Sequence, residues 1–128
     1  MTQAEKRIEL FKKHVFMFQN KLGFNDVEIH VLEQVRPDSK ASWNSIKSNC
    51  QISIFYSKSW IVNPKKLEEV TCDIIIKTAF HEVYEAQFYR IYELLDEKYN
   101  ENLGLEEIHM LVRRAENTIL PIILKEGV

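Results

Sequence analysis

The sequence predicts a single small α+β domain, and three observations lead to this prediction. The chain has 128 residues, a length typical of one domain, with only three Gly and three Pro residues and no repeat or linker-like segment. Apolar residues recur every three or four positions near both ends of the chain, as in amphipathic helices. In the middle they alternate with polar residues, as in half-buried strands. We therefore expect residues 1–128 to fold as one unit in which helices pack against a small sheet.

The first predicted element is a helix from Glu5 to Leu22. Its apolar residues step by three, four, three and four positions and form one face: Ile8, Phe11, Val15, Phe18 and Leu22. Gly23 follows, at a position where a helix C-cap favours glycine. His14 shares the apolar side of this helix, so we expect it to be a packed, hydrogen-bonded histidine rather than a ligand.

Three strands are expected next. In the first, apolar residues alternate with polar ones: Val27, Ile29, Val31 and Val35 with Glu28, His30 and Gln34. His30 is expected to face solvent. The second strand is expected near Ala41 to Ile46 and the third over Gln51 to Ser57, with a turn at Ser48–Asn49 between them. The alternation and the turn predict a small three-stranded antiparallel sheet.

A long helix is predicted after the sheet. Asn63–Pro64 favours a helix start, because Asn caps free backbone N–H groups and Pro is tolerated at the first helical position. Helical apolar spacing continues to about Tyr99, and the segment Asn100–Gly104 breaks it. A final helix opens after this segment and runs until Pro121 interrupts or ends it. The last two helices are expected to form an antiparallel hairpin.

The charge and composition of the chain limit the classes of partner and the cellular location that we expect. The chain has 17 Lys and Arg residues against 19 Asp and Glu, a formal charge of -2 and a pI near 6.1, so nucleic acid is not expected as a partner. No run of 18 apolar residues is present to span a membrane, and the N-terminus lacks the apolar core of a secretory signal. We therefore expect a cytoplasmic protein with no membrane association. Cys50 and Cys72 form no C-x-x-C motif and are expected to be reduced, mostly buried thiols.

The residues that indicate a metal-binding or catalytic function lie in the middle of the long predicted helix. His81 and Glu85 are four positions apart, so one helix face presents an imidazole and a carboxylate that can chelate a divalent metal. Glu82 lies about 100° round the helix from His81, where it would reach a metal-bound water rather than the metal. A catalytic zinc site usually takes three protein ligands, so a third ligand is needed.

Glu116 is the expected third ligand. Reflection of the predicted hairpin through Asn102 brings Glu116 within about one turn of Glu85 and leaves His109 roughly two turns farther away. Glu116 would face the buried seam between the helices, where a carboxylate needs a partner. That partner is a metal or one of three cations: Arg113, Arg114 or Lys77. The alternative for the helix motif is a solvated face with i,i+4 contacts, and for Glu116 an ordinary salt bridge.

Two segments of the chain resemble small zincin-like metalloproteins of tailed bacteriophages and prophages. They are Thr78-Ala-Phe-His-Glu-Val-Tyr-Glu and Arg114-Ala-Glu-Asn-Thr-Ile-Leu, and Ser42-Trp43 and Ser59-Trp60 flank the strands before them. The resemblance implies a minimal zincin-like domain with metal bound by His81, Glu85 and Glu116, and with Glu82 as general base. It also implies that the strand nearest the site, Gln51 to Ser57, aligns an extended peptide by edge pairing. A viral origin would place the protein in the host cytoplasm.

The usual zincin motif ends in His, whereas this chain has Glu85. Zinc is the first expectation for the divalent metal, but a second carboxylate makes the site more anionic and harder, which weakens zinc binding and makes manganese, iron or magnesium relatively more competitive. It also weakens the metal's ability to lower the pKa of bound water. Two functions are therefore expected. The first is a metal-dependent peptidase of phage type that acts on a peptide or protein substrate. The second is a non-catalytic, degenerate zincin-fold protein that binds a protein partner.

Overall fold

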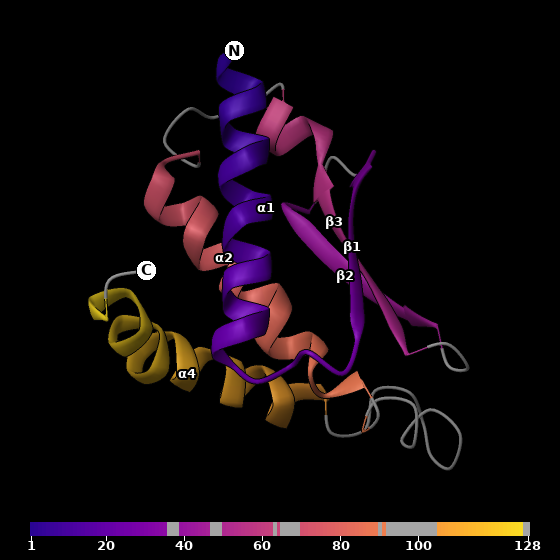
Figure 1. Ribbon diagram of the computed structural model, residues 1–128, viewed down its shortest axis with the longest axis vertical. Coiled ribbons are helices and arrows are strands. Elements are labelled where there is room, and N and C mark those ends of the chain that lie inside the picture. Colours follow the sequence, from indigo (N-terminus) through magenta and orange to yellow (C-terminus); the bar gives the residue numbers. More distant parts are fainter. Residues whose placement is uncertain are drawn as a thin grey trace.

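The computed structural model describes residues 1–35, 39–46, 50–62, 64, 70–89, 91 and 105–126, and it has the predicted α+β class (Figure 1). In chain order the elements are α1 (Gln3–Lys21), β1 (Glu28–Gln34), β2 (Ala41–Ile46), β3 (Gln51–Ser57), the short π-helix η1 (Lys58–Val62), α2 (Cys72–Ala86) and α4 (Leu105–Lys125). α1 and α2 pack together beside the sheet, and α4 packs against α2 (Figure 1).

α1 confirms the first predicted helix. It begins at Gln3, two residues earlier than expected, because the Thr2 side chain accepts a hydrogen bond of 3.1 Å from the backbone N–H of Glu5. Three of the predicted face residues are fully buried: Phe11, Val15 and Phe18. His14 is buried beside them, and its Nδ1 lies 2.9 Å from the carbonyl oxygen of Leu10, as expected of a packed histidine.

The three predicted strands are present, but the sheet is mixed rather than antiparallel. Its order is β1-β3-β2, with β1 parallel and β2 antiparallel to β3. β3 lies between the other two strands, and none of its side chains is exposed; Ile52 and Ile54 are fully buried. Val35, expected on the buried side of the first strand, lies beyond its end and is 83% exposed. His30 is exposed, as predicted, and the expected turn at residues 48–49 lies outside the described residues.

The predicted single helix from residue 64 to residue 99 is wrong at its start and is interrupted after Ala86, and its predicted end near Tyr99 lies outside the described residues. Pro64 lies outside any helix, and α2 begins after Thr71, whose side chain accepts a hydrogen bond of 3.3 Å from a backbone N–H in the first turn. η1 occupies part of the chain before it. α2 ends at Ala86, and a turn follows. Asn63 and the expected break at residues 100–104 lie outside the described residues.

α4 confirms the final predicted helix but continues through Pro121 to Lys125. Proline lacks a backbone N–H, so the helix loses one hydrogen bond at this point. Leu120 and Ile123, on either side of Pro121, are only 6% and 7% exposed. Their burial holds the last turns against the core and keeps the chain helical.

The core lies between α1, α2 and one face of the sheet. Phe18 of α1 and Phe80 of α2 are fully buried and meet edge to face, with ring centroids 5.2 Å apart. Burial of one such ring contributes roughly 2–3 kcal/mol. α2 is thereby anchored along one side, and the polar residues of interest project from its remaining surface.

The two cysteines differ from expectation. Both are free thiols, but both are exposed rather than buried. Cys50 lies in the turn before β3 with a φ of 49°, and Cys72 is the first residue of α2, so neither position faces the core.

Among the residues that the structure describes, no helix combines the length and apolar character necessary for crossing a membrane.

Candidate functional site

Polar side chains from three elements gather where α2 meets β2 and α4. The middle of α2 supplies three of them: His81, Glu82 and Glu85. α4 supplies His109 and Glu116, which are seven residues apart and therefore lie on one face of that helix. β2 supplies Trp43. The helices fix the direction of each side chain, because α2 is held by the core and α4 is held against α2.

His81 bridges α2 and α4. Its Nδ1 lies 2.6 Å from Oε1 of Glu116, and its Nε2 lies 3.1 Å from Oε2 of Glu85. The contact with Glu85, joined by the hydrogen bond to Glu116, raises the pKa of His81 to about 9, although burial opposes this change. In the metal-free protein the ring is therefore protonated at neutral pH and lies between two carboxylates.

One oxygen of the Glu85 carboxylate accepts a hydrogen bond, and the other has none among the described residues. Its Oε1 accepts a hydrogen bond of 3.1 Å from the indole N–H of Trp43. Its Oε2 lies 3.1 Å from Nε2 of His81 and 3.3 Å from Nε2 of His109. This oxygen is buried and has no hydrogen bond among the described residues, so neither ring N–H is aimed at it. Burial raises the pKa of Glu85, but the His81 and Trp43 contacts outweigh burial and lower the pKa overall.

Glu116 pairs with two cationic side chains rather than with Glu85. Besides His81, it contacts Lys77, whose Nζ lies 3.5 Å from Oε2. The salt bridge to Lys77, one of the predicted alternatives, is therefore present. The Lys77 side chain is 60% exposed, so this pair contributes at most about 1 kcal/mol.

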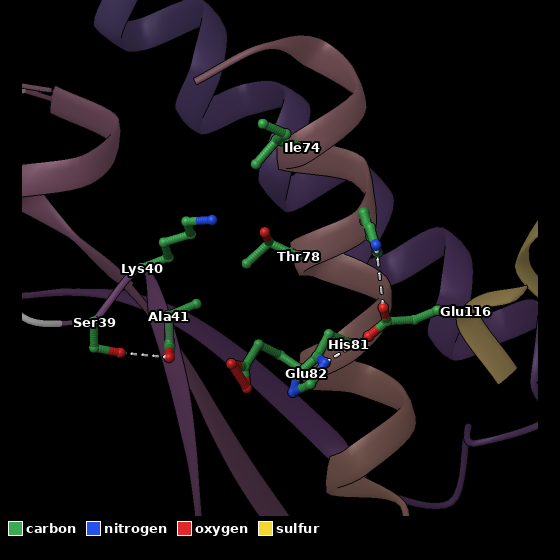
Figure 2. A pocket seen from close by; sticks show the side chains of 9 residues that line it. Ser39, Lys40, Ala41, Ile74, Thr78, His81, Glu82 and Glu116 are labelled. Carbon is green, nitrogen blue, oxygen red and sulfur yellow. Dashed lines mark hydrogen bonds and ion pairs between the residues drawn. The ribbon is translucent and has the colours of Figure 1, made fainter. Parts of the chain in front are cut away.

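Glu82 forms part of the wall of a pocket of about 500 Å³ between α2 and the start of β2 (Figure 2). In Figure 2 its carboxylate points from α2 toward Ala41, whereas His81 turns toward Glu116. Only 7% of Glu82 is exposed. Burial raises the pKa of Glu82 to about 7; His81 opposes the rise and Glu85 adds to it. Such a carboxyl group can accept or donate a proton at neutral pH.

The remaining pocket wall combines the start of β2 and the residues before it with side chains of α2 and α4. The lining residues besides Glu82 are Ser39, Lys40, Ala41, Ile74, Lys77, Thr78, His81 and Glu116. Ala41 and Trp43 are two positions apart in β2, so both project from the face of the strand that meets α2.

β2, not β3, is the strand nearest the site. Ala41 lines the pocket, and Trp43 reaches Glu85. β3 pairs with β1 along one edge and with β2 along the other, so the expectation that residues 51–57 offer an edge to a peptide is wrong. β2 is an outer strand of the described sheet and has the edge that β3 lacks.

The predicted metal ligands His81, Glu85 and Glu116 lie close together, but their donor atoms do not point at one shared metal position. Among the described residues, no three His, Cys, Asp or Glu side chains are arranged, as they stand, to hold one metal ion. In the predicted set, Glu85 and Glu116 contact different nitrogens of the His81 ring. The donor chemistry nevertheless suits a divalent metal, because Oε2 of Glu85 is a buried carboxylate oxygen without a hydrogen bond beside two ring nitrogens.

His109 is the site residue that the sequence prediction placed wrongly. The hairpin was centred on Asn102, whereas the observed pairs, His81 with Glu116 and Glu85 with His109, are centred several residues earlier. A signal was available, because His109 precedes Glu116 by seven residues. If Glu116 faces α2, then His109 must face it too.

Comparison with known protein families, curated proteins and solved structures found no match to this chain.

Proposed function

We propose that this domain is a zincin-like, metal-dependent peptidase in which Glu82 is the general base. The observation that carries the proposal is the place of Glu82 on α2. Its buried carboxyl group, with a pKa of about 7, forms part of a pocket wall and directly follows His81, which pairs with Glu85. Perturbed carboxyl groups of this kind are typical of acid–base catalysis. The resemblance to phage zincin-like metalloproteins supports the same assignment.

Glu82 has the protonation behaviour that the reaction needs. With a pKa of about 7, it is ionised in roughly half of the molecules at neutral pH. It takes a proton from a water molecule as the water oxygen adds to the scissile carbonyl carbon. It then gives this proton to the amine nitrogen as the C–N bond breaks, so proton and electron pair are both accounted for.

His81 and Glu85 would hold the divalent metal together with a third donor from α4. The sequence predicts Glu116 as this third donor. A bound zinc, manganese or iron ion would polarise the carbonyl and lower the pKa of the water. The residues fit such an ion, because Oε2 of Glu85 is buried and lacks a hydrogen bond among the described residues. Oxygen and nitrogen donors together suit these metals.

An extended peptide or protein segment is the substrate class that the pocket favours. β2 is an outer strand whose face toward α2 carries Ala41 at the pocket. A peptide added to its edge would pair through main-chain hydrogen bonds and pass beside Glu82.

The test compares zinc-loaded wild-type protein with Glu82→Gln on a mixed peptide library, with cleavage read by mass spectrometry. We expect the substitution to reduce cleavage at least ~100-fold, because it removes the proton acceptor, and to leave the zinc content unchanged. Glu9→Gln, at an exposed position on α1, is the matched control and should cleave like wild type. If Glu82→Gln cleaves like wild type, Glu82 is not the general base and the proposed mechanism is wrong.

The second candidate function is a non-catalytic interaction module. The observation that favours it is a set of apolar side chains on α4 that are 41–60% exposed: Met110, Leu111, Ile122 and Leu124. In this case neither wild type nor Glu82→Gln would cleave any library peptide, even with one metal bound per chain. Cleavage by wild type alone would exclude this function as the sole activity.

A further inference from the structure

We infer that His109, not Glu116, is the third metal ligand, and that Glu116 holds the His81 ring from its other nitrogen. This inference rests on the proposed metal-dependent function and changes its ligand set to His81, Glu85 and His109. The inference is drawn from the atoms that face one another among the side chains of His81, Glu85, His109 and Glu116.

The distances around Oε2 of Glu85 match those of a zinc site. In a tetrahedral zinc site with bonds of about 2.0–2.1 Å, two ligand atoms lie roughly 3.3 Å apart. Oε2 of Glu85 is 3.1 Å from Nε2 of His81 and 3.3 Å from Nε2 of His109, so both separations already match. Binding an ion there breaks no hydrogen bond to this oxygen among the described residues, although the ion displaces the proton on Nε2 of His81 and takes the place of the His81–Glu85 ion pair.

The two ring nitrogens of His81 face different partners. A histidine binds a metal through one ring nitrogen and commonly donates the other N–H to a carboxylate that fixes the ring. In His81 the Nδ1 faces Oε1 of Glu116 at 2.6 Å, and the Nε2 faces the Glu85–His109 side. Glu116 is therefore in the position of the orienting carboxylate. Lys77 holds its second oxygen at 3.5 Å.

The two possible ligand sets differ in charge. With both rings neutral, two histidines and one carboxylate give a ligand set with a charge of about -1, whereas His81 with Glu85 and Glu116 gives about -2. Two histidines and one carboxylate form a common catalytic zinc set, and the lower charge leaves the ion better able to activate water. His109 thus compensates for the carboxylate at position 85.

One movement is needed to complete the site. The His81 and His109 rings are 6.3 Å apart, centroid to centroid, so His109 must swing toward His81 before both nitrogens meet one ion. The His109 side chain is 41% exposed, whereas Glu85 is 12% exposed. His109 is therefore the ligand with room to move.

The experiment titrates Co²⁺ into the untagged, chelator-treated full chain and into three variants, with visible absorption and calorimetry as readouts. For wild type we expect one Co²⁺ per chain. His109→Ala should bind at least ~100-fold more weakly and change the absorption spectrum, since a nitrogen ligand is lost. Glu116→Gln should bind ~10-fold more weakly with the same spectrum, since only the ring support is weakened. His30→Ala, an exposed histidine on β1, is the matched control and should match wild type.

The outcomes separate this inference from the proposed function. If Glu116→Gln loses the metal and His109→Ala keeps wild-type affinity and spectrum, Glu116 is the ligand and our inference is overturned, while the proposed function stands. If wild type binds neither Co²⁺ nor Zn²⁺, the proposed function itself fails. Circular dichroism checks that each variant is folded. Should His109→Ala prove unfolded, His109→Gln is used, with the same expected loss of affinity and change of spectrum.

Discussion

His81 and Glu116 join α2 to α4 through a contact of 2.6 Å between Nδ1 and Oε1. The two residues are 35 positions apart in the chain, and the Glu116 side chain is only 10% exposed. Because the ring is charged at neutral pH and its partner is shielded from water, this is a charge-assisted hydrogen bond of the stronger kind. It contributes both to the packing of α4 and to the orientation of the candidate site.

Replacement of Glu116 by Ala should destabilise the metal-free protein by roughly 1–3 kcal/mol, because it leaves the charged His81 ring without this acceptor. Urea unfolding followed by circular dichroism measures the change. Lys77→Ala is the control, and it should cost less than about 1 kcal/mol because this partner is largely exposed. Equal losses in the two variants would contradict the role given to His81.

Glu82 should make the metal-free protein less stable as pH rises. Its pKa is about 7 in the folded state against 4.5 as the ordinary value, so the folded state holds the proton longer than the unfolded state does. Stability therefore falls between about pH 4.5 and pH 7, and by roughly 3 kcal/mol in total for this group. Glu82→Gln should remove this decline and be the more stable protein above pH 7. Urea midpoints from pH 4.5 to 8 provide the test, and parallel curves for both proteins would refute it.

His81 should give a pH dependence at higher pH. Its pKa is raised from 6.5 to about 9, so its stabilising effect is fully present below about pH 6.5 and is lost as pH rises through about 9. In the metal-free protein, the stability difference between wild type and His81→Gln should shrink over this interval. NMR titration of the His81 ring gives an independent value of the pKa, and a value at or below 6.5 would disagree with the geometry.

Two phenylalanines on α1 should respond differently to substitution. Phe18 is fully buried and contacts Phe80, so Phe18→Ala should cost roughly 3–5 kcal/mol. Phe16 is 45% exposed, and Phe16→Ala should change stability by about 1 kcal/mol or less. Thermal or urea unfolding of both variants checks the assignment of the buried face. Similar losses would mean that α1 is rotated relative to the core.

Helix α1 was predictable because its information is local. The spacing of Phe11, Val15 and Phe18 identifies one face, and helical periodicity is enough to predict its burial. The start of α2 was not predictable in the same way, because both Asn63–Pro64 and Thr71 carry capping chemistry. Choosing between them depends on tertiary packing, which a local pattern does not contain.

In the sheet and in the site, too, local sequence patterns predict single elements but not how distant elements pair. The alternation of β1 and β3 predicts strands, but it does not say which strand lies next to which. In the site, the i,i+4 relation of His81 and Glu85 is local and was predictable, and the structure places them 3.1 Å apart. The contact between Glu85 and His109 depends on where the chain turns between α2 and α4, and an error of a few residues there moves a partner by a full helical turn.

The strand order β1-β3-β2 also sets a sequence of events during synthesis. β1 and β2 leave the ribosome first, yet neither pairs with the other, and both pair with β3. Until Ser57 has emerged, two edge strands exist without the strand that joins them. The sheet therefore assembles around its last member, and a nascent chain shorter than this has unpaired backbone groups available to other chains.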